Sequence, residues 1–159
     1  MHHFKAVALS LIAMSVFATI AISAKAATSG KIELQGRVGE NCTVAVTQLP
    51  KGTALDIVTG EKAAQVANVV ESCNIGAGYK VSLTSANAGK LLNPLTGAQT
   101  VRFDVGYDNA TGVIAQELVA LRDTAQFGKQ VPVTVSFPAN PQAIAGTYSD
   151  TVTVTIAAK

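Results

Sequence analysis

Short runs of alternating apolar and polar residues recur along this chain and constrain its fold more than any other feature. Such alternation is typical of a β-strand with one buried face and one exposed face. The clearest runs cover residues 43–47, 65–73, 79–84, 100–107, 130–137 and 148–156, and a shorter one is expected at 54–58. Segments rich in Gly, Asn and Pro separate them, as at 74–78 and 87–97. About seven short strands joined by turns predict an antiparallel β-sandwich.

Residues 113–123 do not fit this pattern. Ile114, Leu118 and Leu121 stand at helical spacing, whereas a strand here would place Glu117 on the buried face. We therefore expect a helical turn or an irregular loop, followed by a short strand. Pro132 lies within the run at 130–137 and cannot donate a ladder hydrogen bond, which predicts a place at a strand's start or at an edge.

The first 26 residues have the composition of a secretory signal peptide. Lys5 supplies a positive charge, residues 6–22 form an apolar run, and Ala24 and Ala26 provide a small-x-small cleavage site. A membrane-spanning helix is the alternative, and the small residues at the end of the run favour cleavage instead. The mature chain is then expected to begin near Ala27 and to form a single domain.

The charge balance and the histidine content limit the functions that this protein can have. Two of the twelve basic residues, Lys5 and Lys25, lie in the signal peptide, so ten basic residues face ten acidic ones in the mature chain. This balance argues against binding of nucleic acid, which needs clustered positive charge. His2 and His3 are also in the signal peptide. Without them the mature chain has no Ser-His or Cys-His nucleophile pair, and we expect no catalytic residues and no enzyme activity.

Nothing in the mature sequence indicates a cofactor or a metal site. Asp104, Asp108 and Asn109 could suggest a cation site, but acidic residues beside a turn are more often simply solvated. Paired carboxylates do not stand in an evident catalytic arrangement. We therefore expect no cofactor and no bound metal.

The mature chain begins with an unusual strand pattern at residues 30–38. Ile32, Leu34 and Val38 alternate with polar residues, and Gly36 occupies the remaining position of the apolar row. A glycine inside a strand often marks the close approach of another backbone. An apolar row near a free terminus needs a groove to lie in, and we interpret that groove as part of another molecule. The alternative is an ordinary first strand that pairs within its own domain.

Two cysteines, Cys42 and Cys73, remain in the mature chain. In a secreted protein an even pair is most simply interpreted as a disulfide. It would close a loop of about 30 residues and stabilise the fold by roughly 3 to 4 kcal/mol in the chain-entropy model. A metal or redox pair is the alternative, which the wide spacing and the absence of histidine disfavour.

Taken together, these features resemble the pilin subunits of chaperone–usher fimbriae of Gram-negative bacteria. The resemblance rests on the pattern apolar-x-apolar-x-Gly-x-apolar at 32–38, on Cys42 followed about thirty residues later by Cys73, and on the alternating Thr/Val ending at 146–156. That ending is also similar to spore-coat-U-type secreted domains. The resemblance implies an all-β fold, an incomplete immunoglobulin-like antiparallel β-sandwich that is completed by a donor strand from another subunit.

The resemblance also implies roles for particular residues. Residues 27–39 would be the donor-strand extension and residues 40–159 the pilin domain. The donor residues would be Ile32, Leu34, Gly36 and Val38. The acceptor groove would include Val44, Val46, Val152, Val154 and Ile156. The family often ends in an aromatic residue, whereas this chain ends in Ala-Ala-Lys, which bears on chaperone recognition.

The implied function is that of a structural subunit of a chaperone–usher fimbria, which polymerises by donor-strand exchange and supports bacterial adhesion. Its partners would be copies of itself or other pilins, a periplasmic chaperone and an outer-membrane usher, and it would be exported through the periplasm to the surface fimbria. The sequence does not specify a host receptor. The alternative is a self-contained secreted or periplasmic β-sandwich that acts as a binding module or adhesin.

Overall fold

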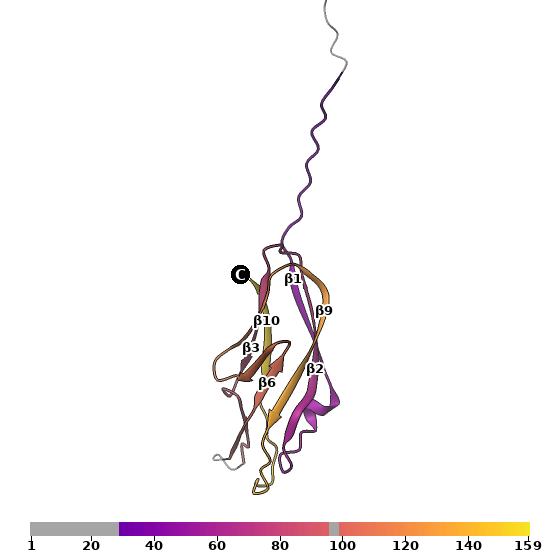
Figure 1. Ribbon diagram of the computed structural model, residues 1–159. Coiled ribbons are helices and arrows are strands. Elements are labelled where there is room, and N and C mark those ends of the chain that lie inside the picture. Colours follow the sequence, from indigo (N-terminus) through magenta and orange to yellow (C-terminus); the bar gives the residue numbers. More distant parts are fainter. Residues whose placement is uncertain (1–28, 96–98) are drawn as a thin grey trace, which may run out of the picture. The chain divides into compact units, whose positions relative to one another are not determined.

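The computed structural model describes residues 29–95 and 99–159 (Figure 1). The predicted signal peptide lies outside these residues. The chain divides into two units, which meet between Arg37 and Val38. The described part of the first unit, residues 29–37, is assigned neither helix nor strand. The second unit holds all the strands of the described residues.

The described residues of the second unit form ten strands and one short 3-10 helix. In chain order they are β1 Cys42–Gln48, η1 Pro50–Thr53, β2 Glu61–Cys73, β3 Tyr79–Ser85, β4 Lys90–Leu92, β5 Thr100–Arg102, β6 Asp104–Tyr107, β7 Ala110–Val113, β8 Leu118–Arg122, β9 Gln126–Phe137 and β10 Val152–Ala158. All paired strands run antiparallel. The predicted antiparallel β-sandwich of immunoglobulin-like type is therefore confirmed.

Two main sheets face each other, and the first and last strands lie at their edges. One sheet has the order β1-β2-β9-β6-β7 and the other has the order β10-β3-β8, while β4 and β5 form a separate pair. Strand β1 pairs only with β2, and β10 pairs only with β3. Strand β1 starts, and β10 ends, at the same end of the domain (Figure 1). Both edges therefore expose unpaired main-chain groups.

Much of the core between the sheets consists of residues that the alternating pattern predicts to face inward. Tyr79, Val81 and Leu83 of β3 are fully buried, as is Val131 of β9. Other buried residues of these runs are Val101, Phe103, Val105, Tyr107, Val133, Val135 and Phe137. The period of two along each strand thus correctly assigns the buried face in these runs.

The disulfide between Cys42 and Cys73 is present and joins the first two strands. The two residues stand directly opposite each other in the β1–β2 register and are 31 residues apart in sequence. Cys73 is buried. The bond fixes the start of β1 against the end of β2.

The run at 100–107 is one strand in the prediction but two in the structure. It breaks at Phe103, so that β5 pairs with β4 whereas β6 joins the larger sheet. The main-chain N–H of Phe103 donates to the carbonyl of Gly89 at 3.1 Å instead of to a ladder partner. Alternation continues through the break because Phe103 remains buried, which explains why the sequence does not reveal it.

Two further segments differ from their predicted structure. The expected loop at 87–97 contains β4, and the expected strand at 54–58 is absent. At the latter position η1 is followed by a turn, in which the Asp56 carboxylate accepts hydrogen bonds from the main-chain N–H groups of Val58 and Thr59. A carboxylate that bonds to main-chain groups two and three residues ahead stabilises a turn and competes with strand formation.

The region from 113 to 123 contains no helix. Strand β7 ends at Val113, residues 114–117 form an irregular loop, and β8 begins at Leu118. The irregular loop and the short strand of the prediction are confirmed, and the alternative of a helical turn is wrong. Ile114 is buried, but Leu121 is 63% exposed because it lies on the outer side of β8. The apolar residues at helical spacing therefore do not share one face.

The last two runs also differ in detail. Strand β10 begins at Val152, four residues later than the predicted run, and Ser149 instead forms an isolated bridge with Leu92. Pro132 lies inside β9, opposite Asn68 of β2, which contradicts its predicted place at a strand's start or an edge. Pairing with β6 begins only at the next residue, Val133, so Pro132 faces no partner on that side.

Candidate functional site

An apolar groove lies between the two edge strands β1 and β10. It encloses a hollow of about 290 Å³. Its walls come from both sheets, from η1 and from β4. The lining residues are Val46, Gln48, Gly52, Leu55, Val66, Ala67, Leu91, Phe103, Val105, Val133, Val135, Phe137, Asp150, Thr151, Val152 and Val154. Most of these are core residues, so the groove reaches the interior of the sandwich.

The edge residues of the groove show that the core is open here. Val46 of β1 is 52% exposed, although it stands in the same row as the half-buried Val44. On β10, Val152 and Val154 are also only half-buried. In a closed sandwich such inward-facing valines would be covered by a neighbouring strand. The core of the sandwich is therefore open between β1 and β10.

A second hollow of about 430 Å³ continues the first toward the end of the domain that holds η1. The two hollows share Gln48, Gly52, Leu55, Leu91 and Asp150. They therefore form one continuous depression, and the second hollow lies near the end of β1 and the beginning of β10.

The structure brings together three of the five residues predicted for an acceptor groove. Val46, Val152 and Val154 all line it. Val44 and Ile156 are half-buried and pack against the core, but they lie nearer the end of the domain where β1 starts and do not line the hollow. In the structure the first and last strands thus line one groove.

Several lining residues were not predicted from the sequence. Leu55 follows η1 in a segment without regular alternation, and Leu91 belongs to β4, a strand that was missed. Phe103 and Phe137 were predicted as core residues, and nothing in the sequence indicates that they end at an opening. The apolar character of Leu55 and Leu91 inside loop-like segments was the one available signal.

The predicted donor residues all lie outside the strands. Ile32, Leu34 and Val38 are 84%, 91% and 86% exposed. A Cβ atom built on Gly36 meets no atom within 4 Å. No strand is assigned between residues 29 and 41, so the alternative of an ordinary first strand is not what the structure describes.

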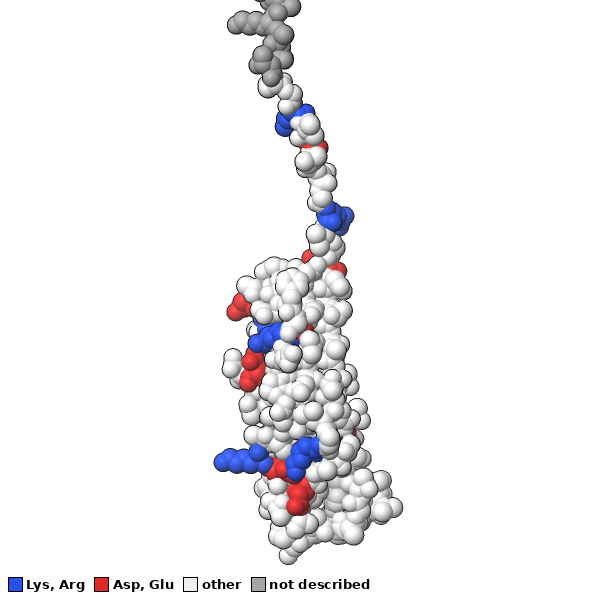
Figure 2. All heavy atoms as spheres, turned by 90° about the vertical axis from the view of Figure 1, so that its right-hand side faces the viewer, with Lys and Arg blue, Asp and Glu red and all other residues white. Residues whose placement is uncertain are grey.

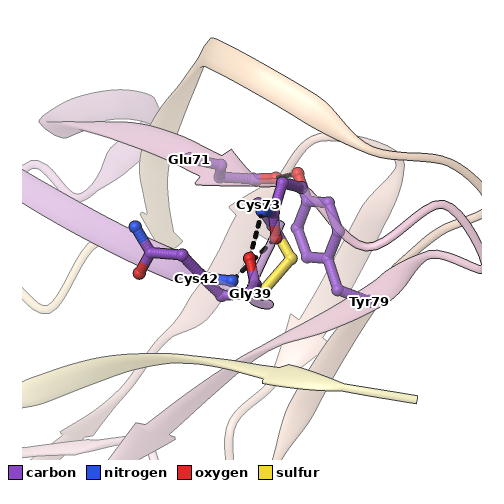
Figure 3. Close-up of a disulfide and its surroundings, with 7 residues drawn as sticks. Gly39, Cys42, Glu71, Cys73 and Tyr79 are labelled. Carbon is purple, nitrogen blue, oxygen red and sulfur yellow. Dashed lines mark hydrogen bonds between the residues drawn. A yellow bond between two sulfur atoms is a disulfide. The ribbon is translucent and has the colours of Figure 1, made fainter. Parts of the chain in front are cut away.

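The main chain just before β1 is held by Asn74, which follows the last residue of β2. The Asn74 main-chain N–H donates to the Asn41 carbonyl at 3.1 Å. Its side-chain Nδ2 donates to the Gly39 carbonyl at 2.7 Å, and its Oδ1 accepts from the Asn41 N–H at 2.7 Å. Gly39 lies close to the disulfide between Cys42 and Cys73 (Figure 3). Residues 39–41 are therefore fixed to the domain beside the disulfide.

A buried ionic cluster lies in the core near the disulfide. The Glu71 carboxylate accepts four hydrogen bonds, from the hydroxyls of Tyr79 and Tyr107 and from two guanidinium nitrogens of Arg122. Burial alone raises the pKa of Glu71, but these hydrogen bonds outweigh it and hold that pKa below its ordinary value. Arg122 also contacts Asp108 at 2.9 Å. The carboxylate is fully engaged, which fits a structural role.

Among residues 29–95 and 99–159 there is no cluster of His, Cys, Asp and Glu that could hold a metal ion. The face of the domain in Figure 2 carries only small mixed groups of acidic and basic residues. In the same described ranges no helix has the length and apolar character to cross a membrane.

The fold and the groove define a class of protein: a disulfide-linked antiparallel β-sandwich whose core is open between its first and last strands. The chain belongs to the Spore Coat Protein U domain family, whose model matches residues 22–155. This family is of the chaperone–usher pilus type, which confirms the resemblance seen in the sequence. Among curated proteins no match is found. Among solved structures the chain is similar to the E. coli Hda pilus minor tip subunit HdaB, with 12% identity, a TM-score of 0.45, and coverage of 76% of this chain and 85% of that chain.

Proposed function

We propose that this protein is a structural subunit of a chaperone–usher pilus and that its groove accepts a strand donated by another subunit. The observation that carries the proposal is the open apolar groove between two edge strands that have no partner on that side. A chain that leaves its core open at one edge and carries an exposed apolar row elsewhere is suited to pairing with further copies.

The physical chemistry of the groove favours a strand as its occupant. A strand inserted between β1 and β10 would satisfy the free main-chain groups of both edges. Its apolar side chains would cover Val46, Val152 and Val154. Burial of three aliphatic side chains contributes on the order of 1.5 to 3 kcal/mol each. This sum is large against a domain stability of about 5 to 15 kcal/mol.

The donor in this proposal is the extension at residues 27–39 of a neighbouring subunit. Its apolar row of Ile32, Leu34 and Val38 matches the alternation that the groove requires. Gly36 would lie where the groove leaves no room for a side chain. The exposure of all three apolar residues in the single chain is consistent with a segment that awaits a partner.

The arrangement of the strands also favours one direction for the donor. Residues 39–41 lie at the end where β1 starts and β10 finishes, whereas the second hollow lies near the opposite ends of these strands. A donor antiparallel to β10 would place Val38 at that second hollow. Each subunit would then receive a strand at one end and extend its own from the other, so that the contact repeats as an open fibre.

In the same proposal a periplasmic chaperone occupies the groove until assembly, and an outer-membrane usher organises the exchange. The exposed apolar groove of a lone subunit would otherwise promote misassociation. The completed fibre would be exported through the periplasm to the cell surface and support adhesion. No enzymatic role is proposed.

The proposal is tested with the mature chain from which residues 27–38 are deleted. We expect the shortened chain to form no polymers, because it has no donor strand. A synthetic peptide of residues 29–39 should bind it and raise its melting temperature, whereas a peptide with Leu34→Asp should not. Continued polymerisation of the shortened chain would contradict the proposal. A stable monomer that does not bind the peptide would instead favour the alternative of a self-contained binding module.

A further inference from the structure

The register of β1 shows that the extension could in principle close the groove of its own domain. If residues 39–41 formed a three-residue hairpin loop, Val38 would stand opposite Cys42 and Leu34 opposite Val46. Residues that stand opposite each other in an antiparallel pair point to the same face. The apolar row of the extension would then join the core-facing row of β1. A loop one residue shorter or longer would turn that row outward.

The residues of this segment are also compatible with such a loop. Three-residue hairpin loops commonly place their last residue in the left-handed region, which asparagine tolerates well. Asn41 occupies that place and Gly39 adds conformational freedom. In the structure, however, neither residue has a positive φ, so the turn is not formed. The sequence permits self-closure, and some other contact must oppose it.

Asn74 supplies that contact. Its single side-chain amide bridges the Gly39 carbonyl and the Asn41 N–H, each at 2.7 Å, while its main-chain N–H holds the Asn41 carbonyl. Both ends of one planar amide are thus engaged, which fixes the separation of these two main-chain groups. A three-residue hairpin loop bends its first two residues into a type I turn, which residues 39 and 40 do not form in the structure. Such a bend would change the separation that the amide spans and so oppose the bridge.

We propose that Asn74 is a positioning residue of the assembly reaction, which prevents the extension from turning back into its own groove and so leaves it available to another subunit. This inference rests on the proposed function, since it presupposes that the extension is a donor strand. In this proposal the contacts of the Asn74 side chain favour an open polymer over a self-closed monomer.

The test compares full mature chains that carry Asn74→Ala, Asn74→Asp or the control Asn68→Ala. The alanine variant loses both side-chain hydrogen bonds, and the aspartate variant keeps only the acceptor for the Asn41 N–H. Asn68 lies on β2, the strand that Asn74 follows, and its side-chain oxygen accepts a hydrogen bond from the Gln65 side chain instead. Each chain is oxidised and refolded, and its mass is measured by size-exclusion chromatography with light scattering. A fluorescent peptide of residues 29–39 then detects monomers whose groove is still open.

We expect Asn74→Ala to raise the amount of monomer that does not bind the peptide, relative to polymer. This ratio should rise by about two- to tenfold for each hydrogen bond lost. Asn74→Asp should lie between this variant and the wild type, and Asn68→Ala should match the wild type. If the alanine variant does not fold, the ratio of monomer to polymer measured for Asn74→Asp tests the proposal instead.

A wild-type-like partition in a folded Asn74 variant would overturn the role of Asn74 alone. Wild-type protein that neither polymerises nor binds the peptide would overturn the proposed function, and this inference with it. The two failures are therefore distinguishable by the behaviour of the wild type.

Discussion

The Arg122 guanidinium holds the Glu71 carboxylate through two hydrogen bonds across the sandwich. Nε donates to Oε2 at 2.9 Å and Nη2 donates to Oε1 at 2.7 Å. Glu71 belongs to β2 of the larger sheet and Arg122 to β8 of the smaller one. This two-pronged contact, in which both side chains are buried, links the two sheets at the end that holds the disulfide.

We expect Glu71→Gln to lower the free energy of unfolding at pH 7 by about 3 to 5 kcal/mol, because it removes the buried anion that holds Arg122 through two hydrogen bonds and leaves only Asp108 beside the guanidinium. The loss should depend on pH. The folded pKa of Glu71 lies below its unfolded value near 4.5, so the carboxylate contributes full stability above pH 4.5 and loses it as the pH falls through the folded pKa. Urea unfolding of both proteins between pH 7 and pH 2.5 measures this change.

The contribution of Glu71 is the difference in the free energy of unfolding between the wild type and Glu71→Gln. The pH dependence of either protein alone does not measure it. Asp56, Glu61 and Asp123 also have lowered pKa values, through hydrogen bonds to the main chain or to Lys159, and they remain in the variant. The stability difference should shrink toward low pH. A difference that stays constant from pH 7 to pH 2.5 would show that Glu71 acts by shape and not by charge.

Replacing both cysteines by serine should lower the stability of the mature domain by about 3 to 4 kcal/mol, because the 31-residue separation frees a loop in the unfolded chain. The measurement is urea unfolding of Cys42→Ser/Cys73→Ser beside the oxidised wild type. Reductant should destabilise the wild type to the same level and leave the double variant unchanged. Equal stability of the oxidised and reduced wild type would contradict the prediction.

The sequence predicts the parts of this fold that depend on a period of two. The inward rows of β3 and β9 and the edge valines of β1 and β10 all follow from alternation alone, because one buried face imposes it. The break at Phe103 could not be predicted in this way, since the buried side chain keeps the alternation intact while the main chain changes its partner.

The remaining features that the sequence did not predict depend on contacts between residues far apart in the chain. Glu71 stands in the inward row of β2, where a charge is expected to be unfavourable, and its partner Arg122 lies 51 residues away on the other sheet. Leu55 and Leu91 line the groove from segments whose local sequence is loop-like. In both cases the environment is made by residues that are distant in sequence.

Gly78→Ala should destabilise the domain by about 1 to 3 kcal/mol, the range for a residue held in an unfavourable main-chain conformation. Gly78 has a φ of +91°, and a Cβ atom there would overlap the Arg122 carbonyl oxygen. Thermal unfolding measures the effect. The matched control is Gly112→Ala, where a Cβ atom meets nothing within 4 Å. Equal melting temperatures for the two variants would contradict the steric explanation.

Gly36→Leu should block assembly without unfolding the domain that carries it. In the single chain a Cβ atom on Gly36 meets no atom within 4 Å, so the larger side chain costs its own domain nothing in packing. In the proposed fibre the same position lies against the main chain of the neighbour's groove, where a leucine side chain has no space. The expected result is a wild-type melting curve for the variant together with the loss of high-mass polymers in light scattering.

The control for this variant is Gln35→Leu, which adds an apolar side chain at the next position. Because successive residues of a strand point to opposite faces, residue 35 would face away from the core of the neighbour and tolerate the change. Polymers should therefore form with Gln35→Leu and not with Gly36→Leu. If both variants polymerise equally, the groove does not come close to the donor at residue 36. If neither does, added bulk anywhere in the extension prevents assembly, and the alternation of the donor has no bearing on its insertion.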